Sequence, residues 1–273
     1  MTRIRGIELL VTGGARGLGF GFARACLERG AAAATLWDVN AEGLAVAVEA
    51  LTAQGHTAHG QVVDVSRADS IEHAARELLA ARGAPDLLCN NAGVVTGKPF
   101  AQHTAEEIER TVRINVLGVM HVTRAVLPAM QQRGSGHVVN IASAAGYLPN
   151  PGMSVYVASK WAVLGWSESL RIELERERSG VRVTTVTPSY IDTGMFEGVR
   201  APLLTPILAP ERLVRDMLRA IERDRILLRA PFMVRLLPLL RGMLPARLFD
   251  LIVGRWFRVY DSMEGFEGRA HSS

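Results

Sequence analysis

A tyrosine and a lysine four residues apart, Tyr156 and Lys160, have the types and the spacing that acid-base chemistry needs. The run from Ser154 to Arg178 lacks proline, so we predict a helix on which both side chains share one face. Because a nearby cation favours a phenolate, we expect a lowered pKa for Tyr156 and a pair that exchanges protons near neutral pH. A surface pair without function is the alternative interpretation.

Lysine is scarce in this sequence, and this favours the functional interpretation. Lys98 and Lys160 are the two lysines among 31 basic residues, and the others are arginines. The lysine at position 160 therefore suggests that a compact ammonium group is needed near Tyr156, which the larger guanidinium group of an arginine would not provide.

Length and composition exclude several classes of protein. With 273 residues, 48% of them hydrophobic, the chain suits one large α/β domain or two small ones. The net charge of +4 is modest and no basic run is interleaved with aromatic residues, so we expect no nucleic-acid partner. Cys26 and Cys89 give neither a disulfide framework nor a metal-binding spacing, and the first residues do not resemble a signal peptide. We therefore expect a cytoplasmic protein without a metal site.

A glycine-rich turn follows the first apolar strand, residues 7–12. Its glycines are Gly13, Gly14, Gly17 and Gly19, with Arg16 and Leu18 between them, and a helix is predicted from there to Arg29. Such a turn lets the backbone approach a pyrophosphate at a helix N-terminus. A plain tight turn is the alternative.

The next predicted strand, residues 34–37, ends at Asp38. An acid in this position accepts hydrogen bonds from an adenosine ribose and repels a 2′-phosphate, which favours NAD over NADP. Arg16 would attract that phosphate and keeps NADP as the second choice. Asp38 as a helix cap before Ala41 is an equal alternative.

Strands and helices alternate along the chain, which predicts a doubly wound parallel sheet of the Rossmann type. Further strands are expected at 59–64, 86–90, 137–142, 181–187 and 226–228, and helices at 41–54, 68–82, 104–132 and 211–223. Ligands bind where the strands end, and the following groups lie there: Gly13, Asp38, Asp64 with Val65, Asn91-Ala92-Gly93 and Ser143.

Asn115 falls inside the predicted helix 104–132, which a capping box at Thr104 and Glu107 opens. Asparagine is a poor helix former, so Asn115 is either solvated or retained for a hydrogen bond, and the sequence leaves both open.

Two late segments are unusually apolar. Residues 190–210 form a loop-like stretch with Met195, Phe196, Leu203, Leu204 and Ile207, which suggests a lid over an apolar substrate. We treat residues 1–230 as the catalytic domain and 231–273 as an extension, in which Pro231, Pro238 and Pro245 break any long helix. Its stretch 231–257 carries many arginines. It either lies on a membrane surface as a peripheral contact or packs over the substrate pocket or another subunit, and we favour packing.

These motifs together resemble the short-chain dehydrogenase/reductase family. The resemblance covers residues 7–193 and rests on the glycine turn, Asp64, Asn90 to Gly93, Asn115, Ser143, Tyr156 with Lys160, and Pro188, Ile191 and Thr193. It implies a homodimeric or homotetrameric enzyme that moves hydride between a nicotinamide and an alcohol or ketone.

The resemblance also implies roles for single residues. Tyr156 would exchange the proton, Ser143 would hold the substrate oxygen together with Tyr156, Lys160 would bind the nicotinamide ribose, and Asn115 would hold a water. The glycine turn, Asp38, Asp64, Asn91 and the segment with Pro188, Ile191 and Thr193 would bind the cofactor. Ser189 departs from the glycine that many members have, which puts the local turn in doubt.

The lid and the extension suggest a bulky apolar secondary alcohol or ketone, as in the steroid and retinoid branch. The alternatives are an NADPH-dependent carbonyl reductase and a dinucleotide sensor without catalysis.

Overall fold

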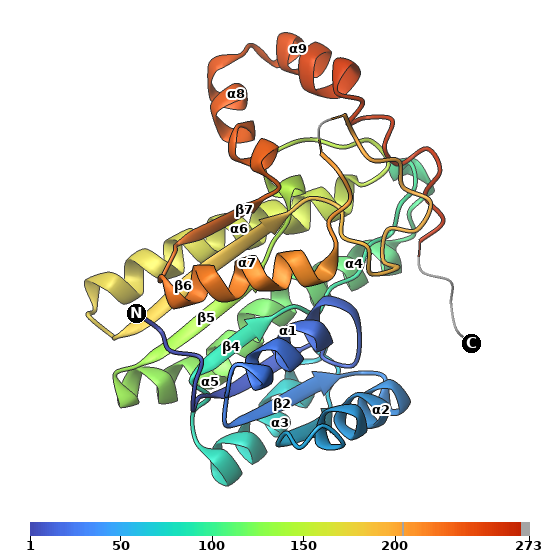
Figure 1. Ribbon diagram of the computed structural model, residues 1–273. Helices are drawn as coiled ribbons and strands as arrows, with labels where there is room; N and C mark the ends of the chain where they lie inside the picture. Colours follow the sequence, from blue (N-terminus) through green and yellow to red (C-terminus); the bar gives the residue numbers. More distant parts are fainter. Residues whose placement is uncertain (204, 269–273) are drawn as a thin grey trace.

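Seven parallel strands form the centre of the protein (Figure 1). The computed structural model describes residues 1–203 and 205–268. The strand order is β3-β2-β1-β4-β5-β6-β7, which confirms the predicted doubly wound sheet. The strands are β1 (Glu8–Thr12), β2 (Ala33–Asp38), β3 (Ala58–Val62), β4 (Leu87–Asn90), β5 (Gly136–Ile141), β6 (Val181–Pro188) and β7 (Leu227–Ala230).

Helices cover both faces of the sheet. One hydrophobic core lies under α1 (Gly17–Glu28), α2 (Ala41–Thr52) and α7 (Pro210–Glu222). The other lies under α3 (Ala68–Arg82), α5 (Val119–Arg133) and α6 (Ser154–Arg176). The central strands are buried on both sides, which explains why they are continuously apolar rather than alternating.

The helix predicted at 104–132 is interrupted. It begins as α4 (Ala105–Val112), with the predicted capping box at Thr104 and Glu107. It then widens into a π-helical turn, η2 (Arg113–Gly118), before it continues as α5. Asn115 lies in this turn, and such turns occur frequently at functional sites.

The C-terminal segment forms short helical pieces that project beyond the sheet (Figure 1). They are η4 (Phe232–Arg235), α8 (Leu237–Met243), α9 (Ala246–Phe249) and η5 (Asp250–Trp256). Pro238 lies in the first turn of α8, and Pro245 immediately precedes α9, so the prolines separate the pieces as expected. In residues 1–203 and 205–268, no helix is long and apolar enough to cross a bilayer.

The lid segment is tied to this C-terminal region. Backbone hydrogen bonds join Leu203 N to Phe257 O at 2.9 Å and Arg200 N to Ser262 O at 3.0 Å. Leu204 of the predicted lid and residues 269–273 of the predicted extension lie outside the described residues. The boundary at residue 230 stays a prediction.

Candidate active site

A polar hollow of about 250 Å³ lies at the carboxyl ends of the strands. It collects nearly all of the residues predicted to bind a cofactor: Gly13, Arg16, Gly17, Leu18, Asp38, Asp64, Val65, Asn91, Ala92, Gly93, Tyr156, Lys160, Pro188, Ile191 and Thr193. Gly19 and Asn115 do not line the hollow and lie behind its wall.

The glycine turn has the geometry for a close backbone approach. Gly13 and Gly17 adopt left-handed φ angles of 65° and 58°, which favour glycine. A side chain at Gly19 would collide with Gly13 O and come within 2.5 Å of Asn91 Nδ2, so Gly19 acts through packing. At the start of α1, Arg16 makes no side-chain cap, and the free N–H groups suit an anionic pyrophosphate. The turn therefore fits a dinucleotide.

Asn91 holds the glycine turn against the neighbouring strand. Its Nδ2 donates to Thr12 O and Gly13 O, both at 3.0 Å. The Oγ1 of Thr12 accepts from the backbone N of Asn91 and of Ala92 at 3.1 Å. The side chain predicted to bind the cofactor thus positions the loop that lines the hollow.

Asp38 turns back toward the glycine turn. Its Oδ2 accepts from Ala15 N and its Oδ1 from Asn40 N, each at 3.0 Å. The cap of α2 is Asn40, whose Oδ1 accepts from Gly43 N at 2.9 Å. The alternative of Asp38 as the cap of α2 was therefore wrong. Asp38 lies two residues before the capping residue Asn40, and its carboxylate binds the glycine turn instead.

Tyr156 and Lys160 lie on α6 and are each 5% exposed, so the surface-pair alternative was wrong. The Lys160 Nζ is 5.6 Å from the centroid of the Tyr156 ring. It donates a hydrogen bond of 2.9 Å to Ile141 O, at the end of β5. Helix α6 thus places a phenol and an amine at the wall of the hollow.

The expectation of a lowered pKa for Tyr156 was wrong for the protein by itself. Burial raises the pKa of Tyr156, and a hydrogen bond with Ser143 opposes this effect only in part. Burial also lowers the pKa of Lys160 to about 8. The physical reason is desolvation, which disfavours the charged forms of both groups.

Asn115 is fully buried and hydrogen-bonded, which settles the open choice in favour of a retained bond. Its Oδ1 accepts from Val94 N at 2.8 Å, and its Nδ2 donates to Val94 O at 2.9 Å and to Ser159 Oγ at 3.1 Å. Asn115 therefore joins the loop after β4 to α6. Its contact on α6 is Ser159, which lies three residues after Tyr156.

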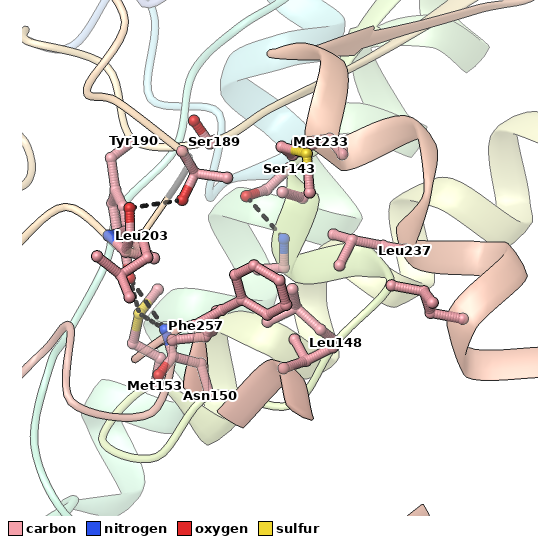
Figure 2. Close-up of a pocket in the computed structure, with 18 of the residues that line it drawn as sticks. Ser143, Leu148, Asn150, Met153, Ser189, Tyr190, Leu203, Met233, Leu237 and Phe257 are labelled. Atoms are coloured by element: carbon pink, nitrogen blue, oxygen red, sulfur yellow. Dashed lines mark hydrogen bonds between the residues drawn. The ribbon is translucent and has the colours of Figure 1, made fainter. Parts of the chain in front are cut away.

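A second, apolar pocket of about 80 Å³ begins at Ser143. In the view of Figure 2, Ser143 and Ser189 lie near its top and Asn150 and Met153 near its bottom. Most of the remaining wall is apolar and comes from the lid and the C-terminal segment: Phe196, Pro202, Leu203, Met233, Val234, Leu237, Leu240, Val253, Phe257 and Val259. Ser143, Ser189 and Phe196 line both spaces, so the two meet there.

Comparison with known proteins agrees with this geometry. A family model described as short chain dehydrogenase matches residues 8–203. The chain belongs to the short-chain dehydrogenases. It is an oxidoreductase that acts on alcohol groups, so catalysis is favoured over the sensor alternative. Solved structures of this fold hold NAD or NADP, and the cofactor here is a nicotinamide dinucleotide of one of these two kinds.

Two relatives belong to the retinol and steroid branch of the short-chain dehydrogenases. Epidermal retinol dehydrogenase 2 of Mus musculus is 34% identical over 97% of this chain and 87% of its own length. Estradiol 17-beta-dehydrogenase 11 of Mus musculus is 31% identical over 97% and 89%. A short-chain dehydrogenase/reductase from Burkholderia phymatum, solved with NAD, has a TM-score of 0.79 at 27% identity and covers 93% of this chain and 97% of its own.

Ser189 fits the short-chain dehydrogenase turn without strain. Its backbone N donates to Ala230 O at 2.8 Å, and its φ lies outside the left-handed region that would require glycine. Among the described residues its Oγ is buried without a hydrogen-bond partner. The doubt about the local turn is thereby removed.

Sequence reasoning missed several wall residues of this short-chain dehydrogenase. Arg110 on α4 also lines the hollow, so that the hollow has a second cation in addition to Arg16. No local sequence pattern indicates that Arg110 would lie there. Leu148, Asn150 and Met153 precede α6 and line the apolar pocket. Their position between Ser143 and Tyr156 was the one available signal.

Proposed function

We propose that this protein is an NAD-dependent dehydrogenase whose substrate is a bulky, apolar secondary alcohol or the corresponding ketone. The observation that carries the proposal is the meeting of two unlike spaces at Ser143. One is the more polar of the two and fits a dinucleotide, and the other is apolar and is closed by the lid and the C-terminal segment. A reacting carbon placed between them would have the cofactor on one side and an apolar wall on the other.

Tyr156 is the proposed proton donor and acceptor. Bound NAD would supply the acceptor of the hydride. In oxidation, Tyr156 Oη takes the proton of the substrate hydroxyl, and in reduction it returns a proton to the carbonyl oxygen. Its burial fits reduction directly, because a raised pKa keeps the phenol protonated at neutral pH.

Ser143 is proposed to hold the same substrate oxygen. Its Oγ accepts from Ala145 N at 3.2 Å, which fixes the side chain. The contact of this Oγ with Pro188 O is long, at 3.4 Å. A substrate oxygen at ordinary hydrogen-bond distance would be a better acceptor, so the hydroxyl is free to exchange partners.

Lys160 and Asn115 complete the proposed catalytic group. Lys160 would bind the nicotinamide ribose and bring its charge near the phenol. Asn115, through Val94 and Ser159, keeps α6 and the loop after β4 in register. The proposed role of Asn115 in holding a water rests on the family resemblance alone.

Asp38 supports NAD over NADP, because a carboxylate beside the glycine turn would repel a 2′-phosphate. An NADPH-dependent carbonyl reductase remains the second candidate, since Arg16 and Arg110 line the same hollow. Fluorescence titration with NADH and NADPH decides between the two. Tighter binding of NADPH would overturn the choice of NAD.

A substrate screen tests the proposed substrate class. Reduction of NAD is followed at alkaline pH with sterol-type and other bulky apolar secondary alcohols and with hydrophilic sugars. We expect turnover of the apolar alcohols, at a rate that falls as hydroxyl groups are added to their skeleton. Turnover of the sugars alone would contradict the proposal.

A homodimer or homotetramer and a cytoplasmic location stay predictions. Light scattering of the purified protein measures the first, and cell fractionation of the full chain measures the second.

A further inference from the structure

The C-terminal segment 231–257 has two apolar faces, and only one of them is covered. The inner face packs on the apolar pocket through Val234, Leu237, Leu240, Val253 and Phe257. The outer face carries six large exposed side chains: Phe232, Leu239, Met243, Leu248, Leu251 and Trp256. Met243 is 72% exposed, and Phe232 and Trp256 are each 64% exposed. Apolar surface gathered in one short segment marks a site of association.

Arginines accompany these exposed apolar side chains. Arg235, Arg241, Arg247, Arg255 and Arg258 are exposed, and within residues 1–203 and 205–268 none of them forms an ion pair. The single acid of the segment, Asp250, accepts a hydrogen bond of 2.6 Å from Tyr260 Oη. The outer face is therefore both apolar and positively charged.

A basic hollow of about 290 Å³ continues this charge beside Phe232. It lies between α7, β7 and η4, and it is lined by six arginines and one acid: Arg212, Arg219, Arg223, Arg225, Arg229, Arg235 and Asp216. Guanidinium groups bind phosphate oxygens through paired hydrogen bonds, so the hollow suits a phosphate group.

We propose that the outer face of segment 231–257 docks on an anionic lipid surface. Phe232, Leu239, Met243 and Trp256 would enter the boundary between headgroups and acyl chains, while the arginines contact headgroup phosphates. A second copy of this chain fits the face less well. A symmetric contact would bring the unpaired arginines of two copies together, and like charges oppose that approach.

Docking would place the apolar pocket next to the source of its substrate. Leu237, Leu240 and Phe257 line the pocket and belong to the same short segment as the inserted side chains. An apolar alcohol dissolved in the lipid could then enter without crossing water. This consequence rests on the proposed function, whereas the docking itself rests on the exposed side chains alone.

Flotation of the purified full-length protein with vesicles tests the docking. The vesicles contain phosphatidylcholine alone or phosphatidylcholine with phosphatidylserine. We expect the protein to float with the anionic vesicles, to float poorly with the neutral ones and to be released by high salt. Failure to float with anionic vesicles would overturn the proposal. Flotation needs no turnover, so it can fail or succeed independently of the dehydrogenase assay.

Two triple variants separate the apolar and the charged contributions. Leu239→Ser/Met243→Ser/Trp256→Ser removes inserted side chains, and Arg235→Gln/Arg247→Gln/Arg255→Gln removes charge. With about fivefold in affinity per arginine, we expect the charge variant to bind about a hundredfold more weakly at low salt. The apolar variant should lose at least as much, and both should oxidise a dispersed small alcohol as the parent does. Flotation of both variants at the parent level would overturn the proposal.

Matched controls change exposed residues elsewhere on the molecule. Arg5→Gln/Arg76→Gln/Arg176→Gln alters the net charge equally, and Val46→Ser removes an exposed apolar side chain on α2. These variants should float as the parent does. If light scattering instead shows a dimer that the apolar triple variant dissociates, with no flotation of the parent, the face belongs to a second copy and the lipid proposal is wrong.

Discussion

The polar hollow and the apolar pocket share Ser143 but are built from different parts of the chain. The hollow is formed mainly at the ends of the strands, and its residues come from successive parts of the sequence between Gly13 and Phe196. The pocket is closed by Phe196, Pro202, Leu203 and Thr205 and by residues 233–259, which are far from Ser143 in sequence. The strand ends suit a nicotinamide dinucleotide, whereas the late segments can vary with the substrate. Changes in the two regions should therefore have separable effects on catalysis, cofactor binding and substrate binding.

The change expected to have the largest effect is at Tyr156, which lines the polar hollow. Tyr156→Phe removes the proposed proton donor, so kcat should fall about a thousandfold, within the range typical of acid-base catalysis. The dissociation constant of NADH should stay nearly constant. Tyr147→Phe, which alters a tyrosine outside both spaces, is the control and should retain activity. Steady-state kinetics measure both, and parental turnover by Tyr156→Phe would refute the assigned role.

The pocket is tested by Phe257→Ala. Loss of a large apolar contact should lower kcat/KM for a bulky apolar alcohol about tenfold to a hundredfold. NADH binding should not change, because Phe257 does not line the polar hollow. The neighbouring Trp256→Ala is the control, since Trp256 is exposed. Equal effects of the two variants in a lipid-free assay would contradict the placement of the pocket.

The glycine turn is tested by a pair of substitutions on one helix. Gly19→Ala would force a side chain against Asn91 Nδ2 at 2.5 Å, so we expect a loss of about 1–3 kcal/mol in the free energy of unfolding and weaker NADH binding. In Gly21→Ala the nearest atom is Val214 Cγ2 at 3.9 Å, so the helix should gain up to about 1 kcal/mol. Urea unfolding gives both values, and equal midpoints would show that the close packing does not matter.

Cofactor choice is tested by Asp38→Asn. Without the carboxylate charge, the affinity for NADPH relative to NADH should rise about tenfold. Asp64→Asn removes a charge from another part of the hollow and should leave the ratio unchanged. Fluorescence titration measures the dissociation constants of NADH and NADPH for both variants. A shift of the same size in both variants would mean that overall charge, and not the position of Asp38, sets the preference.

The dependence of activity on pH tests which effect governs Tyr156 once the cofactor is bound. If burial dominates, the pKa of Tyr156 lies above the assay range, and alcohol oxidation should rise about tenfold per pH unit from neutral to alkaline pH. Ketone reduction uses the protonated phenol and should change little. A plateau in oxidation at neutral pH would show that the Lys160 ammonium outweighs desolvation in the complex.

Much of the site could be predicted because its residues depend on local rules. Gly13, Asn91 and Ser143 each follow a strand and Asp38 ends one, and parallel strands bring their ends to one edge. The sign of the Tyr156 pKa shift could not be predicted, because it depends on how much water the folded chain excludes. The π turn at Asn115 was missed for a similar reason, since its side-chain bonds to Val94 and Ser159 form only in the folded protein.

The sequence by itself determined the doubly wound sheet, the glycine turn and the shared helix face of Tyr156 and Lys160. These features follow from periodicity and spacing, which act over a few residues. Only the tertiary structure decided that segment 231–257 closes the pocket with one face and leaves the other exposed. Both faces carry similar apolar residues, and their difference arises only when the segment folds back over the lid.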